Sequence, residues 1–174
     1  MRNRHPLFAA ALALAVVAPV AVQAHVVPGD VHYHGFADGL MHVATGLDHL
    51  AIAGLVGLWA AWRPVKAALA LIALYGGGIA LTGMLGFSGE FLAMDVLVAA
   101  LAAGGVAAAL WRAPLLVVGT LILAAAGLQG FTHGMAAAAT HDGAGFVAGV
   151  TVATLAVTAV AAGLARRFSL RAFA

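Results

Sequence analysis

The sequence predicts an all-α membrane protein, a polytopic helix bundle with about five transmembrane helices after a signal peptide. Of its 174 residues, 64% are hydrophobic and 8% are charged, which is too little charge to cover a soluble domain. The apolar residues gather in stretches of about 20, the length needed to cross a bilayer. The chain has no cysteine, which excludes disulfides and thiolate chemistry. Its few basic residues are scattered, so we expect no nucleic acid partner.

The N-terminus has the three parts of a secretory signal peptide. These are a basic segment, an apolar core and a small-residue cleavage site, at Arg2 and Arg4, residues 7–20 and residues 22–24. Cleavage after Ala24 would remove residues 1–24 and leave residues 25–174 as a single transmembrane domain that begins at His25. An uncleaved signal anchor is the alternative. Either arrangement places residues 25–34 outside the cytoplasm.

Five apolar stretches follow, each long enough to form a membrane-spanning helix. They cover residues 36–62, 65–86, 90–110, 114–137 and 144–165. Short segments with charged residues, proline or glycine separate them, at residues 63–66 (RPVK), 87–90 (FSGE), 111–114 (WRAP) and 140–143 (THDG). Such residues end helices or start turns, so the sequence predicts five spans.

The positions of Lys and Arg predict the orientation of these spans. With residues 25–34 outside, the segments at 63–66 and 111–114 and the C-terminal tail fall on the cytoplasmic side. These three regions contain every Lys and Arg of residues 25–174, and the two outer loops contain none. We therefore expect a multi-pass protein of the bacterial inner membrane, with a periplasmic N-terminus and a cytoplasmic C-terminus.

The first apolar stretch carries ionisable residues, which are costly inside a membrane and so indicate a functional site. Asp38, His42, Thr45 and His49 are spaced four, three and four residues apart, so on a continuous helix they form one stripe. Asp48 lies beside this stripe. His42 and His49 are then about 10 Å apart along the axis, so we expect them to be successive binding positions rather than ligands of one ion.

The remaining acidic residues and histidines also fall in the outer half of the predicted bundle or outside it. The further candidate ligands are Glu90 and Asp95 in the third stretch, His133 in the fourth, and His25 in the periplasmic segment. Glu90 could equally cap its helix. Imidazole nitrogens combined with a few carboxylate oxygens suit nickel, cobalt, zinc or copper(II). The pattern predicts a cation site open to the periplasm.

Two segments resemble the HupE/UreJ family of hydrogenase and urease accessory membrane proteins. The segment from His42 to His49 (HVATGLDH) is similar to the motif of the family's first span, and Gly127–Gly134 (GLQGFTHG) to a later His-Gly segment. The resemblance implies a nickel or cobalt permease or supply protein. It also implies that the metal-binding residues are His42, Asp48, His49 and His133, with Glu90 at a family acidic position. The chain departs from the family pattern at Val43, Gln129 and Ala136.

These observations favour uptake or supply of Ni²⁺ or Co²⁺ for metalloenzyme maturation, rather than an enzyme. The expected partners are membrane lipid, the metal ion, a metalloenzyme maturation system and a second copy of the chain. Because the ligands must be deprotonated, uptake should weaken as the pH falls through the ordinary histidine pKa near 6.5. The alternatives are a haem-binding electron carrier that uses His49 and His133, a membrane metal-dependent hydrolase, and a partner protein that docks without transporting.

Overall fold

The computed structural model describes residues 35–85, 114–138 and 141–171, and within these ranges the chain is helical without a strand. The expected all-α membrane bundle is confirmed. The predicted signal peptide, the third apolar stretch at 90–110, and the candidate ligands His25, Glu90 and Asp95 lie outside the described residues.

Five described helices build the bundle. They are α2 (Phe36–Thr45), α3 (Leu47–Ala61), α4 (Val65–Met84), α6 (Leu115–Ala138) and α7 (Gly143–Arg171). The helices α4, α6 and α7 are each long and apolar enough to cross a membrane, and α2 with α3 makes a fourth span if the two count as one. The predicted second, fourth and fifth stretches therefore match helices, with α7 continuing past its predicted end at residue 165.

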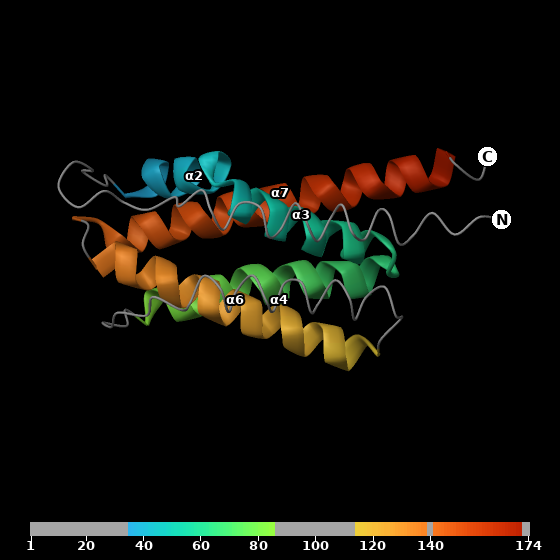
Figure 1. Cartoon of the computed structure of the whole chain (residues 1–174), viewed down its shortest axis with the longest axis horizontal. Helices are drawn as coiled ribbons and strands as arrows, with labels where there is room; N and C mark the ends of the chain where they lie inside the picture. Colours follow the sequence, from blue (N-terminus) through green and yellow to red (C-terminus); the bar gives the residue numbers. More distant parts are fainter. Residues whose placement is uncertain (1–34, 86–113, 139–140, 172–174) are drawn as a thin grey trace.

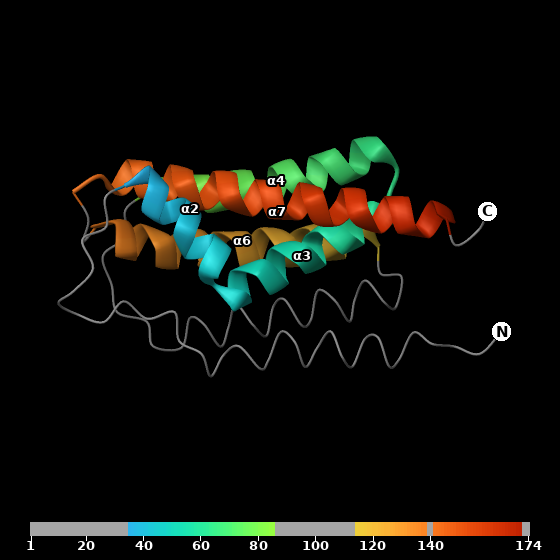
Figure 2. The ribbon, with the colours of Figure 1, turned by 90° about the horizontal axis from the view of Figure 1, so that it is seen from above.

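The first predicted stretch is two helices rather than one, and the expectation of a continuous stripe is wrong. Helices α2 and α3 are bent by 80° at Gly46, whose backbone is extended (φ −80°, ψ 105°) (Figure 2). A Cβ at Gly46 would lie 2.7 Å from Nδ1 of His49 and 2.9 Å from the carbonyl oxygen of His42. A side chain at this corner would therefore force His49 or the end of α2 to shift.

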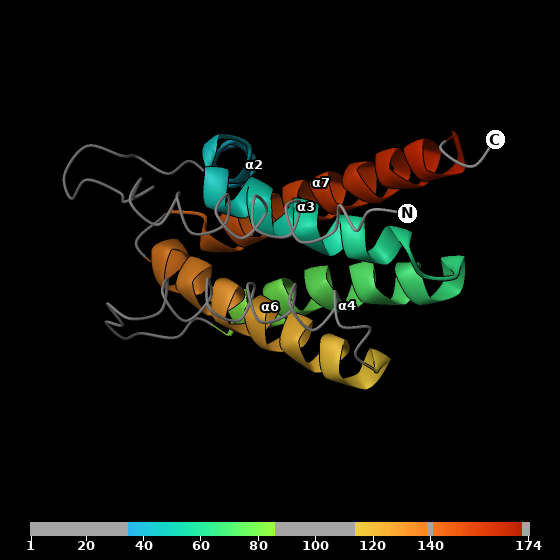
Figure 3. The same ribbon diagram turned by 45° about the vertical axis from the view of Figure 1, so that its right-hand side comes forward.

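The helices form two layers, with α2, α3 and α7 in one and α4 and α6 in the other (Figures 1 and 3). The longest helix, α7, lies along both α2 and α3, and it also contacts α4 and α6. Within the second layer, α4 and α6 pack along each other. The core between the layers contains large, fully buried side chains such as Tyr75, Ile79 and Phe146. The site therefore forms in an interior shared by both layers.

Glycines allow the backbones to touch at several crossings. A Cβ at Gly39 of α2 would lie 2.1 Å from the Phe146 carbonyl oxygen of α7, and one at Gly149 would lie 2.1 Å from the Phe36 carbonyl oxygen. A Cβ at Gly130 of α6 would lie 2.0 Å from Oγ1 of Thr82 on α4. Close packing of small residues drives helix association in lipid, so these contacts fix how the helices are placed.

Charged residues are segregated along the bundle. The Lys and Arg residues of the described part of the chain lie where α3 ends, α4 begins and α7 ends, at Arg63, Lys66, Arg166, Arg167 and Arg171. We call this the basic end. There, Nη2 of Arg166 donates a 2.6 Å hydrogen bond to the carbonyl oxygen of Arg63, which joins α7 to the α3–α4 connection. The described acidic residues, Asp38, Asp48 and Asp142, all lie toward the opposite end.

Candidate metal site

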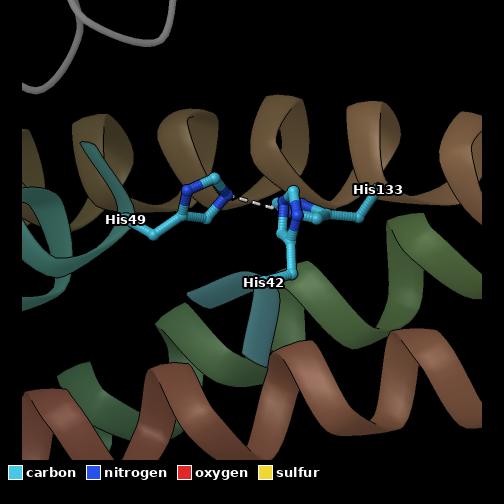
Figure 4. Close-up of side chains that lie close together, drawn as sticks. All are labelled: His42, His49 and His133. Carbon is cyan, nitrogen blue, oxygen red and sulfur yellow. Dashed lines mark hydrogen bonds between the residues drawn. The ribbon is translucent and has the colours of Figure 1, made fainter. Parts of the chain in front are cut away.

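Three imidazoles from three helices converge in the interior of the bundle (Figure 4). His42 comes from α2, His49 from α3 and His133 from α6, and one ring nitrogen of each lies within 4.8 Å of the other two. The ring centroids are 4.7 to 5.1 Å apart. His49 and His133 are buried, and His42 is partly exposed. These three residues form the three-histidine cluster.

The cluster corrects the expectation that His42 and His49 would be too far apart to share an ion. On a straight helix their separation would be about 10 Å along the axis. The bend at Gly46 instead folds α2 back, so that the two rings are in edge-to-face contact at 4.7 Å. His42 and His49 are thus placed to act on one ion together with His133.

The ring of His133 is held by its own helix. Its Nδ1 contacts the backbone carbonyl oxygen of Gln129, one turn earlier on α6. A carbonyl oxygen can only accept a hydrogen bond, so Nδ1 carries the hydrogen and the lone pair of the neutral ring is on Nε2. This Nε2 lies 2.8 Å from Nε2 of His49. The ring therefore presents the correct atom to the centre of the cluster.

The ring of His49 is held from the opposite side by a carboxylate. Its Nδ1 lies 2.9 Å from Oδ1 of Asp48, although the two atoms are not aligned as a regular hydrogen bond. A carboxylate beside a ligating histidine orients the ring and increases its basicity. Asp48 is itself partly exposed.

An aromatic side chain closes the site on the α7 side. Phe146 is fully buried, and its ring centroid lies 5.6 Å from that of His42 and 6.4 Å from that of His133. It excludes water from one side of the cluster while leaving the nitrogens facing each other. Such an apolar wall strengthens any electrostatic interaction made inside the site.

Of the predicted ligands, the structure brings together His42, Asp48, His49 and His133. Asp38 lies one turn before His42 on α2 and is not part of the cluster. Thr45, expected on the same stripe, is exposed and donates its hydroxyl to the carbonyl oxygen of Met41. Of the residues on α2, the described structure therefore brings only His42 into the cluster.

Sequence reasoning missed the surroundings of the cluster. Gln129 stood out only as a departure from the family pattern, whereas its carbonyl oxygen holds His133 and its side chain accepts a hydrogen bond from Tyr75. Phe146 gave no signal, because a phenylalanine in an apolar helix is ordinary. Tyr75 is a polar group within the second stretch, and that isolated hydroxyl was the available clue.

Comparison with known proteins agrees with this arrangement. The chain has no match among curated proteins or among solved structures. The family model described as HupE / UreJ protein matches residues 12–173, nearly the whole chain. That family is associated with nickel and cobalt transport or accessory functions, for which a histidine cluster is suitable. A match of this extent, together with a membrane bundle that carries the cluster, assigns the chain to the HupE/UreJ family.

Proposed function

We propose that the protein takes up or supplies Ni²⁺ or Co²⁺ for metalloenzyme maturation, and that the ion binds to the three-histidine cluster with Asp48. The observation that carries this proposal is the convergence of His42, His49 and His133 from three separate helices. Polar groups inside a membrane are expensive unless they serve a function. Three imidazoles in one place are therefore better explained by a ligand than by packing.

The donor set suits a divalent transition metal. Imidazole nitrogens bind nickel, cobalt, copper and zinc, whereas sites made only of oxygen suit calcium and magnesium. Metal–nitrogen bonds are about 2 Å long, so two nitrogens on one ion lie at most about 4 Å apart. The nitrogens of the cluster, all within 4.8 Å, need only small side-chain rotations to reach this spacing. Asp48 supplies negative charge that offsets the ion.

The cluster leaves coordination positions open. Three neutral imidazoles do not complete the coordination of these ions, so water or a second protein group can occupy the remaining positions. This favours an ion that is received and passed on over one that is held permanently. Asp38, Glu90, Asp95 and His25 are proposed to capture the ion on the periplasmic side before it reaches the cluster.

The membrane orientation is part of the same proposal. The basic end would face the cytoplasm of a bacterial inner membrane, according to the positive-inside rule. The cluster would then open toward the periplasm, and a maturation system would receive the ion on the other side. The C-terminus would be cytoplasmic.

The alternatives gain no support from the contacts of the site. Two axial histidines of a haem stand on opposite faces of the porphyrin. Here the Nε2 atoms of His49 and His133 lie 2.8 Å apart, with the His42 ring against both. A metal-dependent hydrolase would use the same imidazoles to hold its metal, so the cluster does not favour a hydrolase over a transporter. We propose no catalytic residue in the cluster.

Metal binding by the purified protein tests the proposal. Calorimetric titration with Ni²⁺ and Co²⁺ in nanodiscs would compare the wild type with His42→Ala, His49→Ala and His133→Ala. His141→Ala is the matched control, because His141 is exposed and lies outside the cluster. Each cluster variant should lose affinity about 10-fold or more, as expected when a ligand or its partner is removed. Equal affinity in the cluster variants and in His141→Ala would refute the site.

A further inference from the structure

A second set of polar side chains lies in the interior, on the side of the cluster that faces the basic end. The Tyr75 hydroxyl of α4 donates a 2.6 Å hydrogen bond to Oε1 of Gln129 on α6. Both side chains are buried. Gln129 precedes His133 by four residues, so this pair lies one helical turn inward of the cluster.

Thr154 of α7 adds an unusual hydroxyl to this region. Its side chain is 1% exposed, and its Oγ1 makes no hydrogen bond to any described group. The other threonines of the described helices bond to a carbonyl oxygen of their own helix: Thr45, Thr82, Thr120, Thr132, Thr151 and Thr158. Thr154 therefore keeps both its donor and its acceptor capacity available.

Glycine contacts place Thr154 at the depth of Tyr75. A Cβ at Gly76, the neighbour of Tyr75, would lie 2.4 Å from Cδ2 of Leu155, the neighbour of Thr154. Two turns earlier on the same face of α7, Val147 contacts Gly83 of α4, and one turn later the Thr158 carbonyl faces Gly57 of α3. Thr154 lies between these two contacts and therefore faces the interior between α3 and α4.

We propose that an ion released from the three-histidine cluster moves inward past Tyr75, Gln129 and Thr154, whose oxygens act as weak, neutral ligands. This inference rests on the proposed function and adds a route to it. Within the described helices, no carboxylate or histidine lies between this layer and the basic end. The neutral oxygens of these three residues are thus side-chain groups that an ion leaving the imidazoles inward could use.

The chemistry of the layer suits passage rather than storage. A conducting site must bind well enough to admit an ion and weakly enough to release it. Nickel and cobalt prefer imidazole to hydroxyl or amide oxygen, so the ion would be held less firmly here than at the cluster. Water ligands that remain on the ion can also hydrogen-bond to these oxygens, which lowers the cost of moving it.

The Thr154 hydroxyl, which has no hydrogen-bond partner among the described residues, is itself evidence of a role. A buried polar atom without a partner destabilises a protein, and valine would fill the same space without that cost. Positions that break a local rule in this way are expected at functional sites. Thr154 thus lowers the stability of the protein relative to valine but provides an oxygen on the inward side of the site.

Removal of the hydroxyl without change of shape tests the route. Thr154→Val would be compared with Thr154→Ser, which restores an oxygen, and with Thr151→Val and Thr120→Val, whose hydroxyls are bonded to their own helices. Equilibrium Ni²⁺ binding and initial ⁶³Ni²⁺ uptake would be measured on the same proteoliposome preparations. Thr154→Val should bind Ni²⁺ as the wild type does, while its uptake rate falls about tenfold, the change expected when one hydrogen-bond-sized interaction is lost at the barrier.

The remaining outcomes separate this inference from the proposed function. Thr154→Ser and the two valine controls should keep wild-type uptake, and Thr154→Val should unfold no earlier than the wild type. Uptake by Thr154→Val equal to that of the controls would overturn the route. Wild-type protein that binds Ni²⁺ but does not transport it would also overturn the route, while leaving the metal site intact. Wild-type protein that binds no Ni²⁺ would overturn the proposed function as well.

Discussion

Gly39→Ala should weaken metal binding without touching any ligand. Gly39 lies on α2, three residues before His42, at the point where α2 crosses α7. The added Cβ would lie 2.1 Å from the Phe146 carbonyl oxygen, 2.8 Å from the Val150 nitrogen and 3.0 Å from the Gly149 Cα. All three are backbone atoms, so no side chain can rotate to make room.

The size of the displacement follows from these distances. Carbon–oxygen contacts are comfortable at about 3.3 Å, so α2 must move away from α7 by about 1 Å. Metal–ligand distances tolerate about 0.2 Å of error. A 1 Å shift of the helix that carries His42 therefore removes it as a ligand, while His49 and His133 on other helices stay in place. We expect Gly39→Ala to match His42→Ala, with Ni²⁺ affinity about 10- to 100-fold below that of the wild type.

Calorimetry with Ni²⁺ and the visible absorption spectrum of bound Co²⁺ would measure this change. Gly54→Ala on α3 is the matched control, because its Cβ would meet no atom within 4 Å. Alanine is a better helix former than glycine, so the control should be folded and bind normally. If Gly39→Ala kept wild-type affinity and an unchanged Co²⁺ spectrum, the positioning of His42 by α7 would be refuted.

Further predictions concern the bend, the interior, the basic end and pH. Gly46→Ala would bring a Cβ to 2.7 Å from Nδ1 of His49, so Ni²⁺ affinity in titrations should fall, and wild-type affinity would contradict the tight corner. Tyr75→Phe removes the donor to buried Oε1 of Gln129 and should lower unfolding stability by about 1–3 kcal/mol in thermal denaturation. Arg166→Gln breaks the 2.6 Å bond to the Arg63 carbonyl at a partly exposed position and should cost about 1 kcal/mol in the same assay, with the exposed Arg167→Gln as its unaffected control. Protons compete with metal for the imidazoles, so acidification should release bound Ni²⁺, and binding that stays unchanged at every acid pH at which the protein remains folded would contradict histidine ligation.

The spans were predictable because their signals are strong and local. The predicted stretch 65–86 corresponds to Val65–Met84, and 114–137 corresponds to Leu115–Ala138. Each begins beside a proline and is uniformly apolar, and an apolar stretch of this length in a membrane is expected to form a spanning helix. The last helix runs on to Arg171 because nothing after residue 165 breaks it. Arginine favours helix, so the basic end simply continues α7.

The bend was not predictable, because nothing near Gly46 distinguishes it from the chain's many other glycines. Gly54 lies eight residues later inside a regular helix with open space around it. What differs is tertiary: Gly39 and Gly149 let α2 pack on the backbone of α7, and this packing requires a corner at Gly46. The residue types of the site could therefore be predicted from the sequence. Its geometry could not, because it depends on the contact between Gly39 and Gly149, which are more than one hundred positions apart.

The break at Gly46 also places two helix ends, with their partial charges, beside the candidate metal site. Gly46 keeps the helical bonds on either side of it, from its N–H to the His42 carbonyl and from Leu50 N–H to its own carbonyl, at 3.0 Å each. Helix α2 still ends beside the cluster with carbonyl groups that no longer have helical partners, and this end of a helix carries partial negative charge. Helix α3 begins there with the opposite polarity, which Asp48 in its first turn offsets. Interrupted helices of membrane transporters use such carbonyl ends to hold cations. The corner at Gly46 thus brings His42 and His49 into contact, as a straight helix could not, and it places both helix ends beside the residues that would share the ion.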